Sequence, residues 1–508
     1  MAKKPDSPYI ALLEKSKTIQ TYHSILSLLH WDQETYMPPG AIQYRSEQIA
    51  LLSSLAHEEK TSLSYKKLLA KLVHLPSGKI KKKPLSASEH VIIREWRKDF
   101  LRANKLPVSF VKAFSQLTSE SSQIWFTAKK QNNFTLFAPF LDRIIQMNRE
   151  KASILGFEDH PYDALLETHE PSMTTTKITH IFAGLRKELL SLLHKISNAK
   201  APDARFLTKK VDDEKQKEIG EWIASLMPCD SAYTRLDTSS HPFSSAMHPH
   251  DSRITTRFLP NHFISNIFSV LHEAGHSMYE MGLPLQHFGT PLCHSASLSV
   301  HESQSRWWET LIGRSFPFWK HLYPTLQNKL PTLLNKVPLS QFYQAIHYVR
   351  PSFIRVEADE VTYGLHVILR FELEKELISG SLSVHDLPEA WDAKFMQFFG
   401  IKPPSVSQGC LQDIHWSLGE FGYFPTYALG NILAAHLFTS FAKDHPDWKE
   451  RLEQGDLAFI RSWLQQNVHQ WGRRYNYNEL GKRATGKSVD ETAFCNYLKK
   501  KYTEIYNL

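Results

Sequence analysis

Hydrophobic residues recur every three or four positions along most of this chain, which is the spacing of one face of an α-helix. Ser86, followed three residues later by Glu89, has the pattern of a capping box and marks the start of one helix. The other helices expected from this spacing are residues 10–29, 41–73, 108–130, 177–197, 207–226, 352–378, 426–442 and 490–506. The pattern predicts a mainly helical protein.

Two short stretches, residues 233–237 and 253–258, are instead rich in β-branched and aromatic residues, as strands are. They flank His241 and come just before a strongly apolar helix. Two strands at this place predict a small sheet that forms one wall of a site. The sequence has no internal repeat, low-complexity tract or obvious linker.

The apolar helix after these strands carries the chemistry. Pro260 and Asn261 predict its start, with Asn261 as the N-cap. Its apolar residues at helical spacing predict burial, and they are Phe263, Ile264, Ile267, Phe268, Leu271, Ala274 and Met278. His272, Glu273 and His276 form an H-E-x-x-H motif within this stripe.

The motif indicates a catalytic metal site. Two histidines four residues apart lie on one helix face, so both rings can reach one ion. Glu273 lies beside them and can accept a proton from a water on the metal. Burying these groups without a metal would be costly, which favours a metal site over a structural role.

A catalytic zinc ion has three protein ligands and keeps one position for water. The metzincin pattern is excluded, because Tyr279 and Gly282 stand where it needs glycine and histidine. Candidates for the third ligand are Glu280, His287, His294, His301, Glu302 and Glu309. Glu280 is one turn further along the same helix and would overshoot the ion. Glu302 is favoured over His301, since a second helix expected at 295–313 can bring it back to the metal, but the residues alone leave both open.

Further motifs surround this pair of helices in a fixed order. They are Trp31-Asp32-Gln33-Glu34-Thr35, Met37-Pro38, Arg45-Ser46, Tyr162-Asp163-Ala164-Leu165-Leu166, Glu170-Pro171, His241-Pro242-Phe243, Asp251-x-Arg253-x-Thr255, His301-Glu302-Ser303-Gln304, Ile354-Arg355-x-x-Ala358-Asp359 and Gly409-x-x-Gln412-Asp413-x-His415-Trp416. Taken together they resemble the thermostable metallocarboxypeptidases of the Taq type over nearly the whole chain.

The resemblance implies a fold and an activity. It implies an all-helical, two-lobed single peptidase domain over residues 1–508, with a deep substrate groove. His272, His276 and Glu302 would hold one zinc ion per chain, and Glu273 would be the catalytic base. Cobalt could replace zinc, because the same nitrogen and oxygen ligands accept both ions. The implied enzyme removes C-terminal amino acids from peptides one at a time, with broad specificity and poor release next to proline, as a homodimer.

A carboxypeptidase also needs a fixed cation for the terminal carboxylate, and the planar fork of arginine suits this role. Arg253 and Arg355 lie inside the matched motifs and are the candidates. Arg355 is favoured, because Glu357 and Asp359 could orient it and leave donors free. The alternative is that either arginine only pairs with those acids. Arg306 and Arg370 are expected to be helix-surface or packing charges.

Hydrogen-bond donors for the developing oxyanion are expected near the end of the last motif. His415 and Tyr423 have suitable chemistry, and nearby glycines suit a loop that borders a cleft. The assignment is partly an analogy with similar cleft peptidases that use a histidine and a tyrosine. Tyr427 is the alternative tyrosine, and either tyrosine could instead be a core aromatic.

Composition excludes several other classes of protein. The net charge of +8 raises a nucleic-acid hypothesis, but the densest basic run, Lys79 to Lys83, has no recognition motif and reads as a solvated loop. The four cysteines lack paired spacing, as in reduced cytosolic proteins. No stretch is apolar enough for secretion or membrane spanning. We therefore expect a cytoplasmic protein without nucleic-acid or membrane partners.

Two rival functions stay open. A helical oligoendopeptidase or dipeptidyl carboxypeptidase would share the metal site but bind its substrate in a different register. A catalytically silent helical scaffold would keep the metal only for stability. The intact Glu273 and the polar residues around the motif argue against the scaffold.

Overall fold

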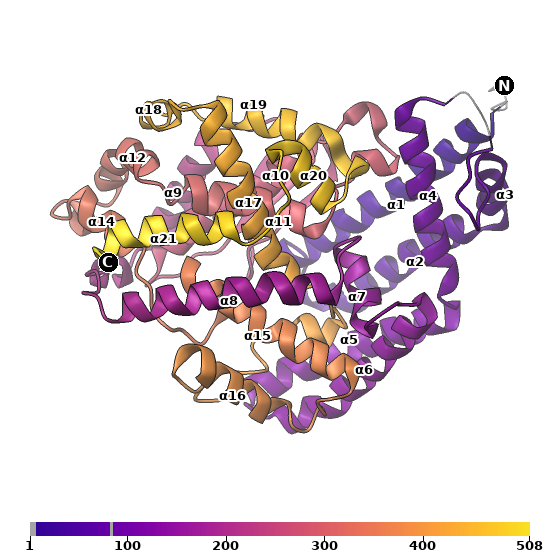
Figure 1. Ribbon diagram of the computed structural model, residues 1–508, viewed down its shortest axis with the longest axis horizontal. Coiled ribbons are helices and arrows are strands. Elements are labelled where there is room, and N and C mark those ends of the chain that lie inside the picture. The colour runs from indigo at the N-terminus through magenta and orange to yellow at the C-terminus, as the bar shows by residue number, and fades with distance from the viewer. Residues whose placement is uncertain (1–6, 82–84) are drawn as a thin grey trace.

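Helices make up most of this computed structural model and surround one short sheet (Figure 1). The structure describes residues 7–81 and 85–508; residues 1–6 of the N-terminus, and Lys82, Lys83 and Pro84 of the predicted basic loop, lie outside it. The predicted class, a mainly helical single domain with a small sheet, is confirmed. None of the helices in the described part combines the length and apolar character of a membrane span.

Along the chain, the helices form two groups, one before the sheet and one after it. Those before the sheet are α1 (Pro8–Thr35), α2 (Ile42–Thr61), α3 (Leu63–Leu72), α4 (Ala87–Lys105), α5 (Val108–Lys130), α6 (Phe134–Leu155), α7 (Pro161–His169), α8 (Thr175–Ser197) and α9 (Asp213–Leu226). Those after it are α10 (Phe263–Met281), α11 (Leu298–Arg306), α12 (Phe316–Lys329), α13 (Pro331–Leu334), α14 (Leu339–Ala345), α15 (Glu360–Ser379), α16 (Leu387–Phe399), α17 (Pro425–Asp444), α18 (Trp448–Glu453), α19 (Ala458–Asn467), α20 (Tyr477–Thr485) and α21 (Thr492–Tyr506).

Hydrophobic spacing located several helices well. The predicted helix at 108–130 matches α5, and those at 177–197, 426–442 and 490–506 match α8, α17 and α21 within two residues at each end. The capping box is present at α4, where the Ser86 amide donates to Glu89 at 2.7 Å and the Glu89 amide donates to Ser86 at 3.2 Å. These helices have periodic apolar faces and conventional ends, which local sequence determines.

Other predicted helix boundaries were wrong, and a side-chain cap explains two of them. The helix expected at 41–73 is broken at Ser62, whose hydroxyl accepts the Tyr65 amide at 3.1 Å and starts α3. The helix expected at 352–378 begins only at Glu360, because Asp359 caps α15 by accepting the amides of Val361 and Thr362. The helix expected at 207–226 starts at Asp213, after a short 3-10 turn.

The sheet has three strands, β1 (Thr234–Thr238), β2 (Ser244–His248) and β3 (Asp251–Thr256), in the order β1-β3-β2. The predicted strands correspond to β1 and β3, which pair in parallel; β2, which was not predicted, runs antiparallel to β3. The sheet adjoins α10, since the Thr256 hydroxyl at the end of β3 donates to Asn266 of α10 at 2.8 Å. The sheet therefore lies beside the helix that carries the H-E-x-x-H motif, as predicted.

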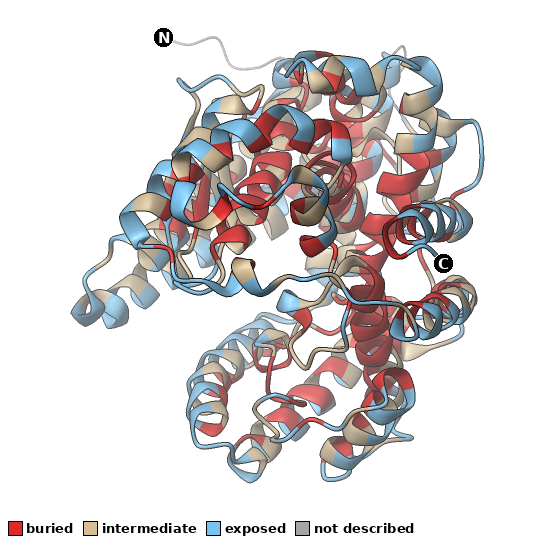
Figure 2. Cartoon of the chain, turned by 90° about the vertical axis from the view of Figure 1, so that its left-hand side faces the viewer, coloured by how far each residue is buried: buried red, intermediate tan, exposed pale blue. Residues whose placement is uncertain are grey.

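Buried residues lie on the inner sides of the helices, and exposed residues lie on their outer sides (Figure 2). One extensive core runs through α5 to α21, and a smaller cluster lies under α1, α3 and α4. Leu292, from the turn before α11, packs into the smaller cluster and joins it to the body of the protein. A cavity of about 600 Å³ lies between the end of α10 and α19, lined by residues such as Leu283 and Arg461 and not by the motif histidines. The predicted substrate groove stays a prediction.

Candidate metal centre and active site

Helix α10 presents the two motif histidines from one face, as the spacing predicts. Its apolar stripe is buried in the core, while the side chains of His272 and His276 are 19% and 15% exposed to solvent. The helix begins one residue later than predicted: His262 is the N-cap, and no side chain caps the first turn, so the assignment of Asn261 as the cap was wrong. Burial of the stripe, more than its cap, fixes this helix in place.

Helix α11 brings Glu302 back to the histidines. Ser297 caps it by accepting the Val300 amide at 3.2 Å. At Gly275 the backbones of α10 and α11 approach so closely that a Cβ there would lie 2.5 Å from the Gln304 carbonyl oxygen. A side chain at this position would push the helices apart, so glycine permits the approach.

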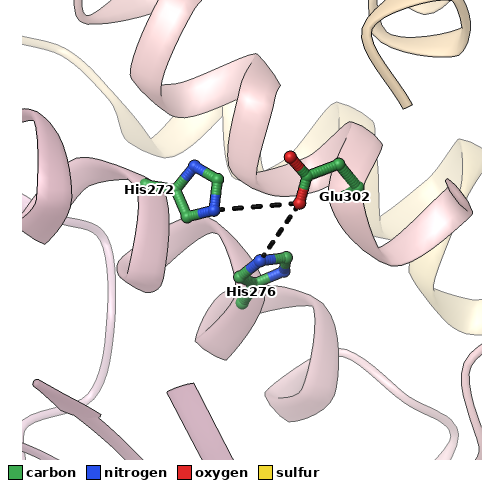
Figure 3. A group of neighbouring side chains, drawn as sticks. All are labelled: His272, His276 and Glu302. Atoms are coloured by element: carbon green, nitrogen blue, oxygen red, sulfur yellow. Dashed lines mark ion pairs between the residues drawn. The ribbon is translucent and has the colours of Figure 1, made fainter. Parts of the chain in front are cut away.

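His272, His276 and Glu302 point toward one common point (Figure 3). The Glu302 Oε2 atom lies 3.8 Å from His272 Nε2 and 3.6 Å from His276 Nε2. Within the described residues these three form a group whose ligand atoms all lie within 4.8 Å of one another. Ligands about 2.0–2.2 Å from a central ion would be separated by distances of this size, so the spacing suits a bound metal.

A second layer of charges holds His272 and Glu302. His272 Nδ1 donates to Glu309 at 2.8 Å, Arg306 Nε donates to the Glu302 Oε1 atom at 2.7 Å, and Arg306 Nη1 contacts Glu309 at 3.0 Å. Glu309 lies on a π-helical turn, Trp307–Ile312, that continues α11; the helix predicted at 295–313 is therefore shorter and irregular at its end. Such turns recur at functional sites. Arg306 is a half-buried partner of the site and not a helix-surface charge.

Within the described residues, the remaining third-ligand candidates lie outside the group of possible ligands. Glu280 accepts from His301 Nε2 at 2.8 Å, and His301 Nδ1 lies 2.6 Å from His276 Nδ1. His294 Nε2 contacts Gln20 at 2.9 Å, and His287 lies in a short turn after α10. Glu302 is the candidate that faces both motif histidines, through its Oε2 atom, which also accepts the Ser305 hydroxyl at 3.2 Å.

The electrostatics of the group fit a cation. Burial lowers the pKa of His272, but the nearby carboxylates of Glu302, Glu309 and Glu273 outweigh it and raise that pKa to about 9. The raised pKa shows that the carboxylates favour a positive charge at His272. With Nδ1–H donated to Glu309, that charge is either a proton on Nε2 or a divalent ion that takes the place of this proton.

Glu273 is buried beside the metal group, with 6% of its surface exposed. Burial raises its pKa to about 7, and the carboxylates of Glu302 and Glu309 raise it further against the opposing effect of His272. A carboxylate with a pKa near neutrality can both accept and return a proton. The environment of Glu273 therefore suits the base predicted from the motif.

His415 and two tyrosines form a second polar cluster. The His415 ring lies 5.2 Å from the Tyr423 ring, and His415 Nε2 is hydrogen-bonded to the Tyr427 hydroxyl at 3.1 Å. Burial lowers the pKa of His415 to about 3, and Arg355 and Arg370 oppose its protonation. Burial also raises the pKa of Tyr423, with a contribution from Glu302. The ring is therefore neutral and the phenol protonated, so both can donate hydrogen bonds.

Arg355 is buried, with 4% of its surface exposed, and its main partner is Asp413. The Arg355 Nη2 atom lies 2.9 Å from Asp413 Oδ1, and Nη1 donates to the Tyr363 hydroxyl at 3.1 Å. The expectation that Glu357 and Asp359 orient this arginine was wrong, because Glu357 pairs with Arg257 and Asp359 caps α15.

Arg253 is engaged in the sheet. It makes two contacts with Asp251, at 2.8 and 3.0 Å, and its guanidinium stacks 4.6 Å above the Trp31 ring.

Arg370, predicted as a surface or packing charge, is completely buried and contacts Asp413 at 2.6 Å. Asp413 was predicted only as part of the last motif, yet it joins two arginines; its acidic side chain inside that motif was the available signal.

Comparisons with known proteins agree with this geometry. The family model of the carboxypeptidase Taq (M32) metallopeptidases matches residues 11–502. The thermostable carboxypeptidase 1 of Thermus thermophilus is 38% identical over 99% of both chains, and carboxypeptidase 1 of Bacillus subtilis is 36% identical over 97% of both. The crystal structure of the M32 carboxypeptidase from Deinococcus radiodurans superposes with a TM-score of 0.94 at 35% identity, covering 99% of this chain and 100% of that one. The predicted resemblance is confirmed: this chain belongs to the carboxypeptidase Taq (M32) family of metallopeptidases.

Proposed function

We propose that this protein is a metal-dependent carboxypeptidase that releases C-terminal amino acids from peptides one at a time. The observation that carries the proposal is the convergence of His272, His276 and Glu302, with the buried Glu273 beside them. Three ligands and an adjacent carboxylate are the components of hydrolytic metal sites. The full-length similarity to proteins named carboxypeptidases supports the choice of reaction.

The proposed cofactor is one zinc ion per chain, with cobalt as a possible substitute. Two imidazole nitrogens and one carboxylate oxygen form a ligand set that suits zinc, and cobalt accepts the same donors. When bound, the ion would act as a Lewis acid that polarises the scissile carbonyl and acidifies water.

The protein side chains would carry the proton and hold the substrate. Glu273 would accept a proton from the attacking water and return it to the leaving amine. His415 and Tyr423 would donate hydrogen bonds to the carbonyl oxygen as negative charge develops on it. Tyr427 is the alternative donor, but its hydrogen bond to His415 gives it a role in orienting that ring.

Recognition of the C-terminus would come from Arg355, with Arg253 as the alternative. Asp413 fixes two of the Arg355 nitrogens and Tyr363 takes a third contact, so the guanidinium is held rigidly with two of its five N–H groups unaccounted for by these bonds. A rigid arginine makes charge-assisted bonds to a carboxylate at little entropic cost. Broad specificity, a homodimer and a cytoplasmic location, which the four free cysteines would suit, are further parts of the proposal.

The decisive experiment follows the products of an N-acylated peptide with a free C-terminus by mass spectrometry, with and without a chelator. Sequential loss of single C-terminal residues that stops with chelator is the expected result. Dipeptides or internal fragments would instead support a dipeptidyl carboxypeptidase or an oligoendopeptidase. An intact peptide with a stoichiometrically metal-loaded protein would favour the silent scaffold.

A further inference from the structure

The two motif histidines are supported in different ways on the side away from Glu302. His272 Nδ1 contacts a carboxylate directly, at 2.8 Å from Glu309. His276 Nδ1 instead makes two contacts with His301: it lies 2.6 Å from the His301 ring Nδ1 and 3.1 Å from the His301 backbone oxygen. The other nitrogen of His301 lies 2.8 Å from Glu280. Glu280, His301 and His276 thus form a continuous chain that ends at the metal group.

Proton positions in this chain are coupled. If His276 is to offer its Nε2 lone pair to an ion, its proton must be on Nδ1. The His301 Nδ1 atom, 2.6 Å away, must then be unprotonated, since two N–H groups cannot point at each other. A neutral His301 consequently has its proton on Nε2, where Glu280 accepts it.

The opposite arrangement of the protons would prevent His276 from binding a metal. With the His301 proton on Nδ1, that nitrogen would donate to His276 Nδ1 and push the His276 proton onto Nε2, which faces Glu302. A protonated Nε2 has no lone pair for a metal. The carboxylate of Glu280 disfavours this arrangement, because a carboxylate accepts hydrogen bonds and cannot donate one to His301.

We propose that Glu280 and His301 are positioning residues that select the metal-binding tautomer of His276, a role that rests on the ligand set of the proposed function. His301 precedes the ligand Glu302 in the sequence but acts from behind His276, not on the ion. Both of its ring nitrogens are engaged within the chain, which leaves none to bind the metal. Partners of this kind around metal-bound histidines change metal affinity by about 10- to 100-fold when removed.

The test is a double-mutant cycle on zinc affinity, measured by competition with a zinc chelator of known affinity. Glu280→Gln should weaken binding about tenfold or more, since an amide can donate to His301 and stabilise the wrong tautomer. His301→Ala should also weaken it, while one ion per chain still binds at saturating zinc. In His301→Ala, the His276 Nδ1–H can still donate to the backbone oxygen of residue 301. Adding Glu280→Gln to His301→Ala should therefore have no further effect.

Controls separate this role from charge and from folding. Glu59→Gln, in a partly exposed glutamate on α2 paired with Lys15, is a matched loss of one carboxylate and should leave zinc affinity unchanged. Thermal midpoints of the metal-free variants should stay within a few degrees of the wild type. The proposal would be overturned if the losses of zinc affinity in the two single variants add fully in the double variant. It would also be overturned if the zinc affinity of Glu280→Gln stays within about twofold of the wild type. A wild type that binds zinc but releases no C-terminal residue would instead refute the proposed function and leave the tautomer selection standing.

Discussion

Arg355 and Asp413 form a buried ion pair, with 2.9 Å between Arg355 Nη2 and Asp413 Oδ1. The second oxygen of Asp413 contacts Arg370 at 2.6 Å, so one carboxylate holds two guanidinium groups. Because Arg355 and Asp413 come from separate sequence motifs, the pair joins the segment before α15 to the loop that carries His415. The net positive charge of this trio suits a nearby substrate carboxylate.

Arg355→Ala tests whether that charge anchors the substrate. We expect kcat/KM on free-acid peptides to fall by a factor that corresponds to about 2–4 kcal/mol of transition-state stabilisation, because one side of a desolvated ion pair is removed. C-terminally amidated versions of the same peptides should be poor substrates already, and the substitution should affect them much less. The difference between the two losses isolates the contact with the carboxylate.

Equal losses on acid and amide peptides would make Arg355 structural, through its support of Asp413. Arg253→Ala, assayed on the same pair of peptides, would then test the other candidate. Its side chain already makes two contacts with Asp251, so we expect a small and equal effect on both peptides.

Tyr423 and Tyr427 differ in their relation to His415, and this separates their expected roles. Tyr423→Phe should lower kcat by about 100-fold, as loss of one oxyanion donor does, with little change in metal content. Tyr427→Phe removes the hydrogen bond to His415 Nε2 and should have a smaller effect, since it misplaces a donor without deleting one. Single-turnover rates would measure both, and the reverse order of effects would assign the oxyanion to Tyr427.

Glu302→Ala tests the ligand set directly. Loss of one of three protein ligands should lower bound zinc strongly when the protein is dialysed against metal-free buffer and its metal content is measured. At saturating zinc, His301→Ala and Glu280→Ala should keep a stoichiometry near one. If Glu280→Ala strips the metal and Glu302→Ala does not, both the ligand assignment and its transfer from the family are wrong.

The local sequence was enough to predict those features of the site that depend on one helix alone. The H-E-x-x-H motif needs only one turn of α10, and the periodic apolar residues around it predicted that helix and its burial. Breaks set by one capping side chain were missed, because residues on both sides of Ser62 continue a helical pattern. Asp359 was misread for the same reason: its cap of α15 is clear only once the helix start is known.

Contacts between distant segments could not be predicted from spacing. Glu302 was favoured over His301, but the family motif was needed to select it. The approach at Gly275, the π-helical turn that places Glu309 against His272, and the pairing of Asp413 with Arg355 all depend on how helices pack. Periodicity indicates which face of a helix is buried, but not which polar residue it will meet there.

Buried histidines should make the fold sensitive to acid. His469 is completely buried, its Nε2 contacts Gln304 at 2.9 Å, and burial with the nearby Arg461 lowers its pKa to about 3. In the unfolded chain the pKa is about 6.5, so below that pH the unfolded state binds a proton that the folded state does not. The free energy of unfolding should therefore fall as pH decreases from about 6.5 toward 3, by up to ~1.4 kcal/mol per pH unit for this group.

Urea unfolding of metal-free protein at pH 7, 6 and 5 checks this effect. His469→Gln can keep the hydrogen bond to Gln304 but cannot take up a proton, so its stability should depend less steeply on pH than that of the wild type. Parallel pH dependences in the two proteins would show that His469 does not contribute.

Glu273→Gln separates the chemistry of the site from its metal binding. The carboxylate is not one of the three grouped ligands, so zinc content and thermal midpoint should stay close to the wild type. The amide cannot accept the proton of the attacking water, so turnover should be nearly abolished. Glu273→Asp retains the base but withdraws it by one methylene, and it should keep more activity than the glutamine variant. A glutamine variant with wild-type zinc content and turnover within about tenfold of the wild type would remove Glu273 from this role. The base would then have to be another group at the site, and a shifted acid limb of the kcat/KM profile against pH would identify its pKa.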